Sequence, residues 1–118
     1  NPKVKLAFSS GSNLNFKEPI VLNDLAGIGR VDVAFVNENE VLVTYMETDE
    51  IKTYLRCKKV SVSGKVSKAF TISEIDASRS TGVPQLEIVN KNAYVVWTVS
   101  EDKKNQLKTV KFLFEGLD

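Results

Sequence analysis

Alternating apolar and polar residues run through most of the chain and predict β-strands. The alternation is clearest in residues 30–36, where Val31, Val33 and Phe35 fall on one face. A period of two is typical of a strand that buries one of its faces. No helical period of useful length is present. Other segments with strand character lie at 4–8, 16–22, 40–47, 51–60, 67–73, 92–100 and 106–114.

Short polar turns separate these segments, at residues 37–39, 63–65, 90–92 and 102–105. About nine short strands at such close spacing predict an all-β protein, built as a sandwich, a barrel or part of a β-propeller. An internal repeat favours the propeller, because propellers repeat one four-stranded unit along the chain.

The repeat places residues 29–47 over residues 81–100, with an offset of 53 that falls to 52. Each unit holds four strands in about fifty residues, which is the size of a propeller blade. We therefore expect antiparallel four-stranded blades in an incomplete propeller: the end of one blade at 4–28, a full blade at 29–73 and a partial blade at 81–114. The matched positions are Gly29 with Gly82, Val33 with Leu86, Phe35 with Ile88, and Asn37 and Asn39 with Asn90 and Asn92.

Composition narrows the range of functions. The 118 residues fit a single unit, and 16 basic against 15 acidic residues leave a net charge of +1. This balance gives no electrostatic case for nucleic acid or an anionic membrane, and no apolar run approaches the roughly 18 residues of a membrane span. The chain begins with Asn1, not Met, so we expect a product of processing or a part of something longer.

The chain has no histidine and one cysteine, Cys57. Ser-His-Asp and Cys-His catalysis, His-ligated metals and an internal disulfide are thereby excluded. We expect no cofactor and no metal, and Cys57 falls on an apolar strand face as a small buried residue.

The segment "SSGSNLNF", residues 9–16, resembles the Asp-box of bacterial sialidases, which reads Ser-x-Asp-x-Gly-x-x-Trp/Phe. Ser9 and Phe16 match that frame, whereas Gly11 and Asn13 stand where the aspartate and the glycine would be. The resemblance implies a turn between the third and fourth strands of a blade. Ser9 and Asn13 would hold this structural turn, and Phe16 would pack into the blade.

The longer frame, from "FKEPIVL" through "GRVDVAF" and "VLVTYME" to "AYVVWT", is similar to the sialidase-like propellers of secreted bacterial proteins. The resemblance implies an extracytoplasmic binding or structural module, related to carbohydrate. It also implies partnership with the rest of a propeller, or self-association through open sheet edges. Two alternatives stay open: part of an exo-sialidase whose active site is completed by residues outside this chain, and a stand-alone β-sandwich that binds proteins.

In such propellers the site lies on the face formed by the loops that follow the second and fourth strands of each blade. Here those loops are expected at 23–29, 47–50, 74–82 and 100–105. Arg30 and Arg79 stand at the entries to inner strands, where a guanidinium can hold a substrate carboxylate through two hydrogen bonds. Alternatively, each arginine pairs with a nearby carboxylate, such as Asp32 or Asp76, for structure.

The stretch "METDE", residues 46–50, brings Glu47 and two further carboxylates into one expected loop. Paired carboxylates can hydrolyse glycosides or bind calcium, and a charged hairpin tip is the simplest interpretation. Tyr45 lacks a motif that marks a nucleophile and is expected to pack within a blade. The candidate ligand-binding residues are therefore Arg30, Asp32, Glu47 and Arg79.

Overall fold

The computed structural model describes residues 2–11, 14–75, 82–101 and 103–118, which form antiparallel β-sheets. No α-helix occurs in these residues, and the prediction of an all-β fold is confirmed. The strands are β1 (Lys5–Leu6), β2 (Ile20–Val21), β3 (Ala26–Phe35), β4 (Glu40–Thr48), β5 (Thr53–Ser61), β6 (Phe70–Ile75), β7 (Gln85–Val89), β8 (Asn92–Glu101) and β9 (Lys104–Leu113), followed by a 3-10 turn, η2 (Phe114–Gly116).

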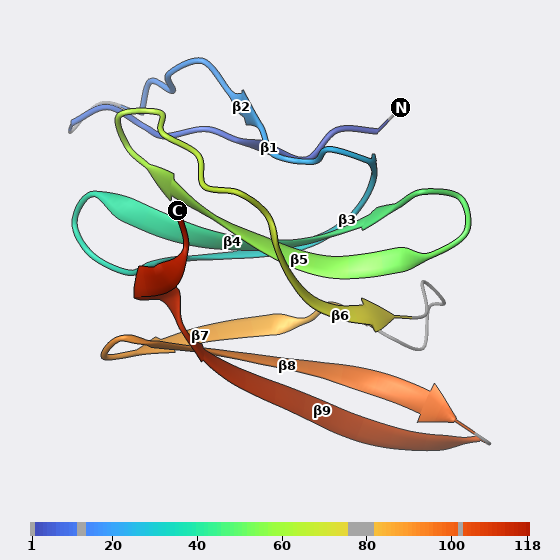
Figure 1. Ribbon diagram of the computed structural model, residues 1–118. Coiled ribbons are helices and arrows are strands. Elements are labelled where there is room, and N and C mark those ends of the chain that lie inside the picture. The colour runs from blue at the N-terminus through green and yellow to red at the C-terminus, as the bar shows by residue number, and fades with distance from the viewer. Residues whose placement is uncertain (1, 12–13, 76–81, 102) are drawn as a thin grey trace.

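The strands group into sheets of two, four and three: β1–β2, β3–β4–β5–β6 and β7–β8–β9. The sheets stack in three layers with the four-stranded sheet in the middle (Figure 1). Every strand pairs with its neighbour in sequence, and within the described residues the sheets do not close into a ring. The antiparallel sheets of the prediction are therefore confirmed, whereas the propeller is not.

Two hydrophobic cores hold the layers together, one on each face of the four-stranded sheet. A β-sandwich has a single core between two sheets, so this arrangement differs from the sandwich alternative. The core toward β7–β8–β9 contains Leu42, Met46, Leu55, Leu86, Ala93, Val95, Trp97 and Phe114. The core toward β1–β2 contains Val4, Leu22, Val41, Val43, Tyr45 and Val60.

Strand β4 is the centre of the molecule, because each residue from Val41 to Glu47 is buried. Its side chains alternate between the two cores, with Leu42 and Met46 in one and Val43 and Tyr45 in the other. A strand covered on both faces reads as a near-continuous apolar run instead of an alternating one. This explains why residues 40–47 are rich in apolar residues at both parities.

The two halves of the sequence repeat form equivalent hairpins, β3–β4 and β7–β8. The matched glycines adopt the same backbone region, with φ of 93° at Gly29 and 66° at Gly82. This left-handed region favours glycine over any other residue. In β3, the register with β4 shifts on both sides of Gly29, so the glycine marks a bulge.

The turn at residues 9–16 does join two paired strands, β1 and β2, and Ser9 pairs with Phe16 across it. The Ser10 amide donates to the carbonyl of Asn15 at 2.9 Å. The expected packing of Phe16 into a blade is wrong, because its side chain is 68% exposed. Phe16 borders a groove that no other strand of the described residues covers. Asn13 lies outside the described residues.

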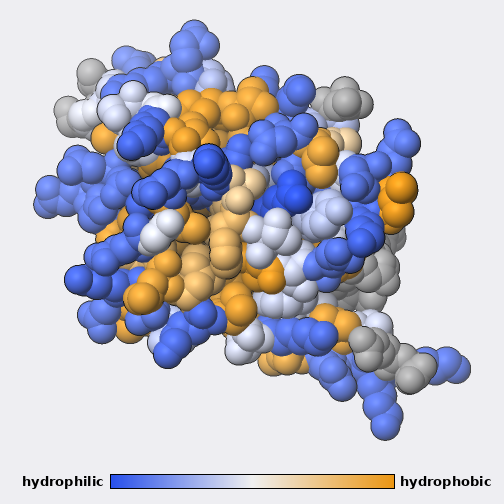
Figure 2. All heavy atoms as spheres, in the orientation of Figure 1, coloured by the Kyte–Doolittle hydropathy of each residue, from blue (hydrophilic) through white to orange (hydrophobic). Residues whose placement is uncertain are grey.

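Apolar and charged residues are mixed over the surface seen in Figure 2, consistent with the near-zero net charge. Within the described part of the chain, no helix is long and apolar enough to cross a membrane.

Candidate functional site

Strands β4, β6 and β8 finish at one end of the molecule, at the right of Figure 1, and the connection from β2 to β3 turns at the same end. We call this the site end, because the sequence places the candidate residues in the connections that leave these strands. The β2–β3 connection is shorter than expected, because β3 already begins at Ala26, and the β4–β5 connection lies two residues later than expected, because β4 runs to Thr48.

Glu47 lies in strand β4 and not in the expected loop, and its side chain is fully buried. One carboxylate oxygen accepts hydrogen bonds from the backbone amides of Asp24, at 3.0 Å, and Leu25, at 2.7 Å. The other accepts from the guanidinium of Arg56 at 3.2 Å. These donors replace water around the buried charge, and they fix the β2–β3 connection onto the four-stranded sheet.

Lys58 extends this polar network along β5. Its buried ammonium donates to the carbonyl of Leu22 at 2.7 Å and to the carboxylate of Asp24 at 3.2 Å. Asn23 continues the network toward the N-terminus, because its side-chain oxygen accepts from the Val4 amide at 2.7 Å. The network thus ties the β2–β3 connection both to β5 and to the segment before β1.

Tyr45 and Glu47 lie on the same face of β4, two residues apart, as a tyrosine–carboxylate pair. The Tyr45 hydroxyl is buried and has no hydrogen-bond partner among the described residues. Burial, and secondarily the charge of Glu47, raises the pKa of Tyr45 well above its usual value. Burial of this phenol agrees with the packing within the sheet that the sequence predicts for Tyr45.

Arg56 is the arginine that sequence reasoning missed. Its guanidinium also donates to the Thr71 hydroxyl at 3.0 Å and lies over the Tyr54 ring at 4.4 Å. The signal was present in "RCKK", where Arg56 and Lys58 share one face of β5 beside a neighbouring strand that carries Glu47. Opposite charges on adjacent strands form cross-strand pairs.

Asp32 links two sheets. Its carboxylate accepts from the adjacent Val33 amide at 2.8 Å and from the Leu86 amide of β7 at 2.9 Å. Val33 and Leu86 are matched positions of the sequence repeat, so one carboxylate joins equivalent amides of the two hairpins. Asp32 and Glu47 come from neighbouring strands, but their hydrogen bonds lead to different partners.

Arg30 lies half-buried in the β3 bulge, with a φ of 53°. A non-glycine residue in this region is strained, and such strain concentrates at functional sites and tight bends. Arg79 lies outside the described residues. The structure therefore brings Arg30, Asp32 and Glu47 onto two adjacent strands, and it leaves their predicted role in ligand binding untested.

The β4–β5 hairpin tip carries the remaining acidic residues. Asp49 accepts from the amides of Ile51, at 3.0 Å, and Lys52, at 2.8 Å, and these hydrogen bonds lower its pKa. Lys52 in turn pairs with Glu74 of β6 at 3.2 Å, with both side chains more than half exposed. In the described residues, no group of three or more Cys, Asp or Glu side chains is placed to hold a metal ion.

A cleft of about 450 Å³ opens at the site end between β6 and the β8–β9 pair. Its volume falls within the range of about 300–1,000 Å³ that small-molecule sites occupy. Polar and charged side chains from all three strands line it around the edge of an indole that is 6% exposed. The lining residues are Ser73, Glu74, Ile75, Trp97, Val99, Ser100 and Lys108.

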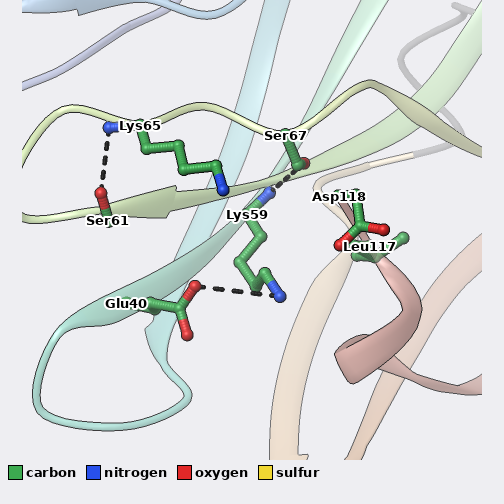
Figure 3. Close-up of a pocket in the computed structure, with 7 residues that line it drawn as sticks. All are labelled: Glu40, Lys59, Ser61, Lys65, Ser67, Leu117 and Asp118. Carbon is green, nitrogen blue, oxygen red and sulfur yellow. Dashed lines mark hydrogen bonds and ion pairs between the residues drawn. The ribbon is translucent and has the colours of Figure 1, made fainter.

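A second cavity, at the opposite end of β5, measures about 70 Å³ and is too small for a drug-sized ligand. Its hydroxyls already serve the fold: Ser67 accepts from the Lys59 amide at 2.8 Å, and Ser61 accepts from the Lys65 amide at 2.9 Å (Figure 3). Lys59 also lies 3.8 Å from the carboxylate of Glu40. These hydrogen bonds hold the β5–β6 connection in place. The cavity is therefore not the candidate site.

The cleft at the site end is thus the candidate binding site, and the buried Glu47 network lies on the opposite face of the four-stranded sheet. Comparisons with models of known protein families, with curated proteins and with solved structures found no match to this chain.

Proposed function

We propose that this chain is a non-catalytic part of a sialidase-like β-propeller and that it binds carbohydrate in the cleft between β6 and β8–β9. One observation supports the proposal that the chain is non-catalytic. The tyrosine–carboxylate pair that this chain could offer a glycosidase, Tyr45 and Glu47, is buried, and Glu47 is bound by two backbone amides and Arg56. Neither group can reach a sugar without unfolding the β2–β3 connection.

The character of the cleft supports carbohydrate as the ligand. Sugars present hydroxyl groups that both donate and accept hydrogen bonds, and the cleft offers a carboxylate from Glu74, an ammonium from Lys108 and the hydroxyls of Ser73 and Ser100. Its position at the site end agrees with the face where the resemblance to sialidase-like propellers places ligands. An extracytoplasmic location follows from the same resemblance.

The propeller part of the proposal is supported by how the sheets stack. A middle sheet that is buried on both faces, with β3 lying beside β7, is the relation expected between neighbouring blades. Such stacking leaves the outer sheets available for further sheets of the same kind.

Two measurements test the proposed function. NMR titration with N-acetylneuraminic acid and with neutral hexoses should shift the resonances of Ser100 and the Trp97 indole, and Lys108→Ala should weaken binding at least tenfold. Lys91→Ala, on an exposed lysine far from the cleft, is the matched control. Absence of sugar-dependent shifts in the cleft would rule the carbohydrate proposal out.

A fluorogenic sialoside assay tests the non-catalytic part. No turnover above buffer is expected. Turnover that Glu47→Gln abolishes, in a variant that still folds, would show instead that the chain belongs to a hydrolase.

A further inference from the structure

An uncovered apolar strip runs along β3. Val31, Val33 and Phe35 alternate on one face of this strand and are 49%, 50% and 61% exposed. A groove of about 420 Å³, which we call the β1–β3 groove, lies between this strip and β1. Phe8 and Phe16 line its other side. Contiguous exposed apolar side chains of this kind mark interaction surfaces.

The rest of the same sheet face is covered. The β1–β2 pair lies over β4 and β5 and buries Val41, Val43, Tyr45 and Val60. In the described residues β1 pairs with β2 alone, so its other edge keeps unpaired backbone groups beside the groove. The β1–β2 layer thus ends at β1, and the apolar strip on β3 stays exposed to solvent.

The internal repeat shows what covers such a strip. Val33 and Phe35 match Leu86 and Ile88 of β7, and those two residues are packed in a core. The strand that lies beside them is β3 itself, which contributes Ile28 and Ala34 to the same core. The carboxylate of Asp32 adds a hydrogen bond to the Leu86 amide.

Strand β3 thus covers Leu86 and Ile88 in the second repeat, whereas no strand of the described residues covers the matched Val33 and Phe35 in the first. In the four-stranded sheet, β4 stands between β3 and β5. The resemblance places the turn at 9–16 between the third and fourth strands of a blade, so the β1–β2 pair corresponds to β5–β6. Among the described residues, the two positions without an occupant are therefore those of a β3-type and a β4-type strand.

We propose that the β1–β3 groove binds an antiparallel pair of strands of the β3–β4 type. The second strand of this hairpin pairs through its backbone with the free edge of β1, and the first covers Val33 and Phe35 with small apolar side chains. This is β-strand addition, in which main-chain hydrogen bonds give affinity and alternate side chains give specificity. The inference rests on the proposed propeller assembly and names the partner of one uncovered face.

The path of the chain fits this docking. Strand β4 finishes at the site end, where the N-terminal end of the chain also lies (Figure 1). A β3–β4 hairpin placed ahead of residue 1 therefore delivers its second strand antiparallel to β1 through a short connection.

The test appends a copy of residues 26–48 to the N-terminus through a short Gly-Ser linker. Docking should slow backbone hydrogen exchange at Lys5, whose amide faces away from β2, and at Val33 at least tenfold, and should raise the midpoint of thermal unfolding. A control copy with Ile28→Asp and Ala34→Asp inside the appended hairpin should give neither effect.

Variants of the groove itself make the test specific. Val33→Asp with Phe35→Glu should abolish the protection, whereas Leu107→Glu, at an exposed apolar position on β9, should leave it unchanged. Both groove positions are exposed, so the variant chain is expected to fold. If the fusion does not fold, the hairpin is added as a separate peptide and the same amides are followed by NMR.

Three results would overturn the inference: no slowing at β1, slowing at the edge of β9 instead, or dimers of the unmodified chain that Val33→Asp with Phe35→Glu converts to monomers. The last result would assign the groove to a second copy. Failure here differs from failure of the proposed function, because sugar binding is read at Ser100 and Trp97, on the other side of the four-stranded sheet.

Discussion

At the scale of single residues, Glu47 shows how a buried charge can organise a connection. Replacing it with glutamine removes the negative charge and leaves one acceptor oxygen where two served, one for the backbone amides of Asp24 and Leu25 and the other for Arg56. Because the pair is broken at its fully buried member while Arg56 stays only partly exposed, Glu47→Gln should lower the free energy of unfolding by about 3 kcal/mol. Urea unfolding followed by Trp97 fluorescence measures this change.

The control for this prediction is Glu74→Gln, which breaks the exposed pair with Lys52. Exposed pairs contribute less than about 1 kcal/mol, so the control should stay close to the parent protein. Equal losses in the two variants would show that burial of Glu47 does not set the cost.

The Asp49 carboxylate predicts a local dependence on pH. The amides of Lys52 and Ile51 lower its pKa in the folded protein below its usual value. Its stabilising effect is therefore present above the ordinary carboxyl pKa, and it is lost as the pH falls through the lowered value. In Asp49→Asn the stability difference from the parent should be largest at neutral pH and should shrink in acid.

NMR titration of the Ile51 and Lys52 amides checks the Asp49 prediction directly. Their resonances should move only below the usual carboxyl pKa in the parent protein and should not move in Asp49→Asn. A midpoint at or above the usual pKa would contradict the prediction.

Residue identity predicted some of these roles and missed others. Cys57 was expected to be a small buried residue, and it is. Glu47 was placed in a loop, because Met46 is followed by a run of polar residues that is typical of a hairpin tip. Its burial depends on the β2–β3 connection, which folds over it from 22 residues away. A local pattern cannot show such a contact.

At the scale of the elements, the alternation in β3 predicted the strand and the residues that share each face. It did not predict which of the two faces of β3 is buried, since that depends on how far the neighbouring sheets extend over this strand. Strand β4 was recognised by its β-branched and aromatic residues, and its position between two cores became clear only when both neighbouring sheets were in place.

Close contact between β3 and the N-terminal segment gives a prediction for Gly27. A Cβ atom there would lie 3.0 Å from the carbonyl oxygen of Pro2 and 3.2 Å from a methyl group of Val4. Overpacking of this kind costs about 2 kcal/mol, so Gly27→Ala should lower the free energy of unfolding by roughly that amount.

Gly116→Ala is the matched control, since no atom lies within 4 Å of its Cβ position and its backbone carries no positive φ. Thermal unfolding of both variants should show a lower midpoint for Gly27→Ala alone. A neutral Gly27→Ala would mean that the segment before β1 moves aside without cost.

At the scale of the whole molecule, the sequence predicted antiparallel sheets and the positions of their hairpins. The repeat carried this prediction, because Gly29 and Gly82 mark equivalent bends. The sequence could not show whether the sheets form a closed propeller ring, since closure depends on strands beyond those that the repeat contains.

The single cysteine offers a test of global stability. Burial raises the pKa of Cys57 to about 12, so almost none of it is thiolate near neutral pH. A disulfide reagent at pH 8 should therefore label the folded protein only through unfolding, and labelling should accelerate in step with added urea. Rapid labelling without denaturant would contradict the burial of β5.

The order of the strands also has a consequence for biosynthesis. Each sheet is a meander in which every strand pairs with its neighbour in sequence. A ribosome releases the chain from its N-terminus, so the four-stranded sheet can be complete while β7–β9 are still being made. We expect the hydrogen bond from Leu86 to Asp32 to be the first link between that finished sheet and the next one to emerge.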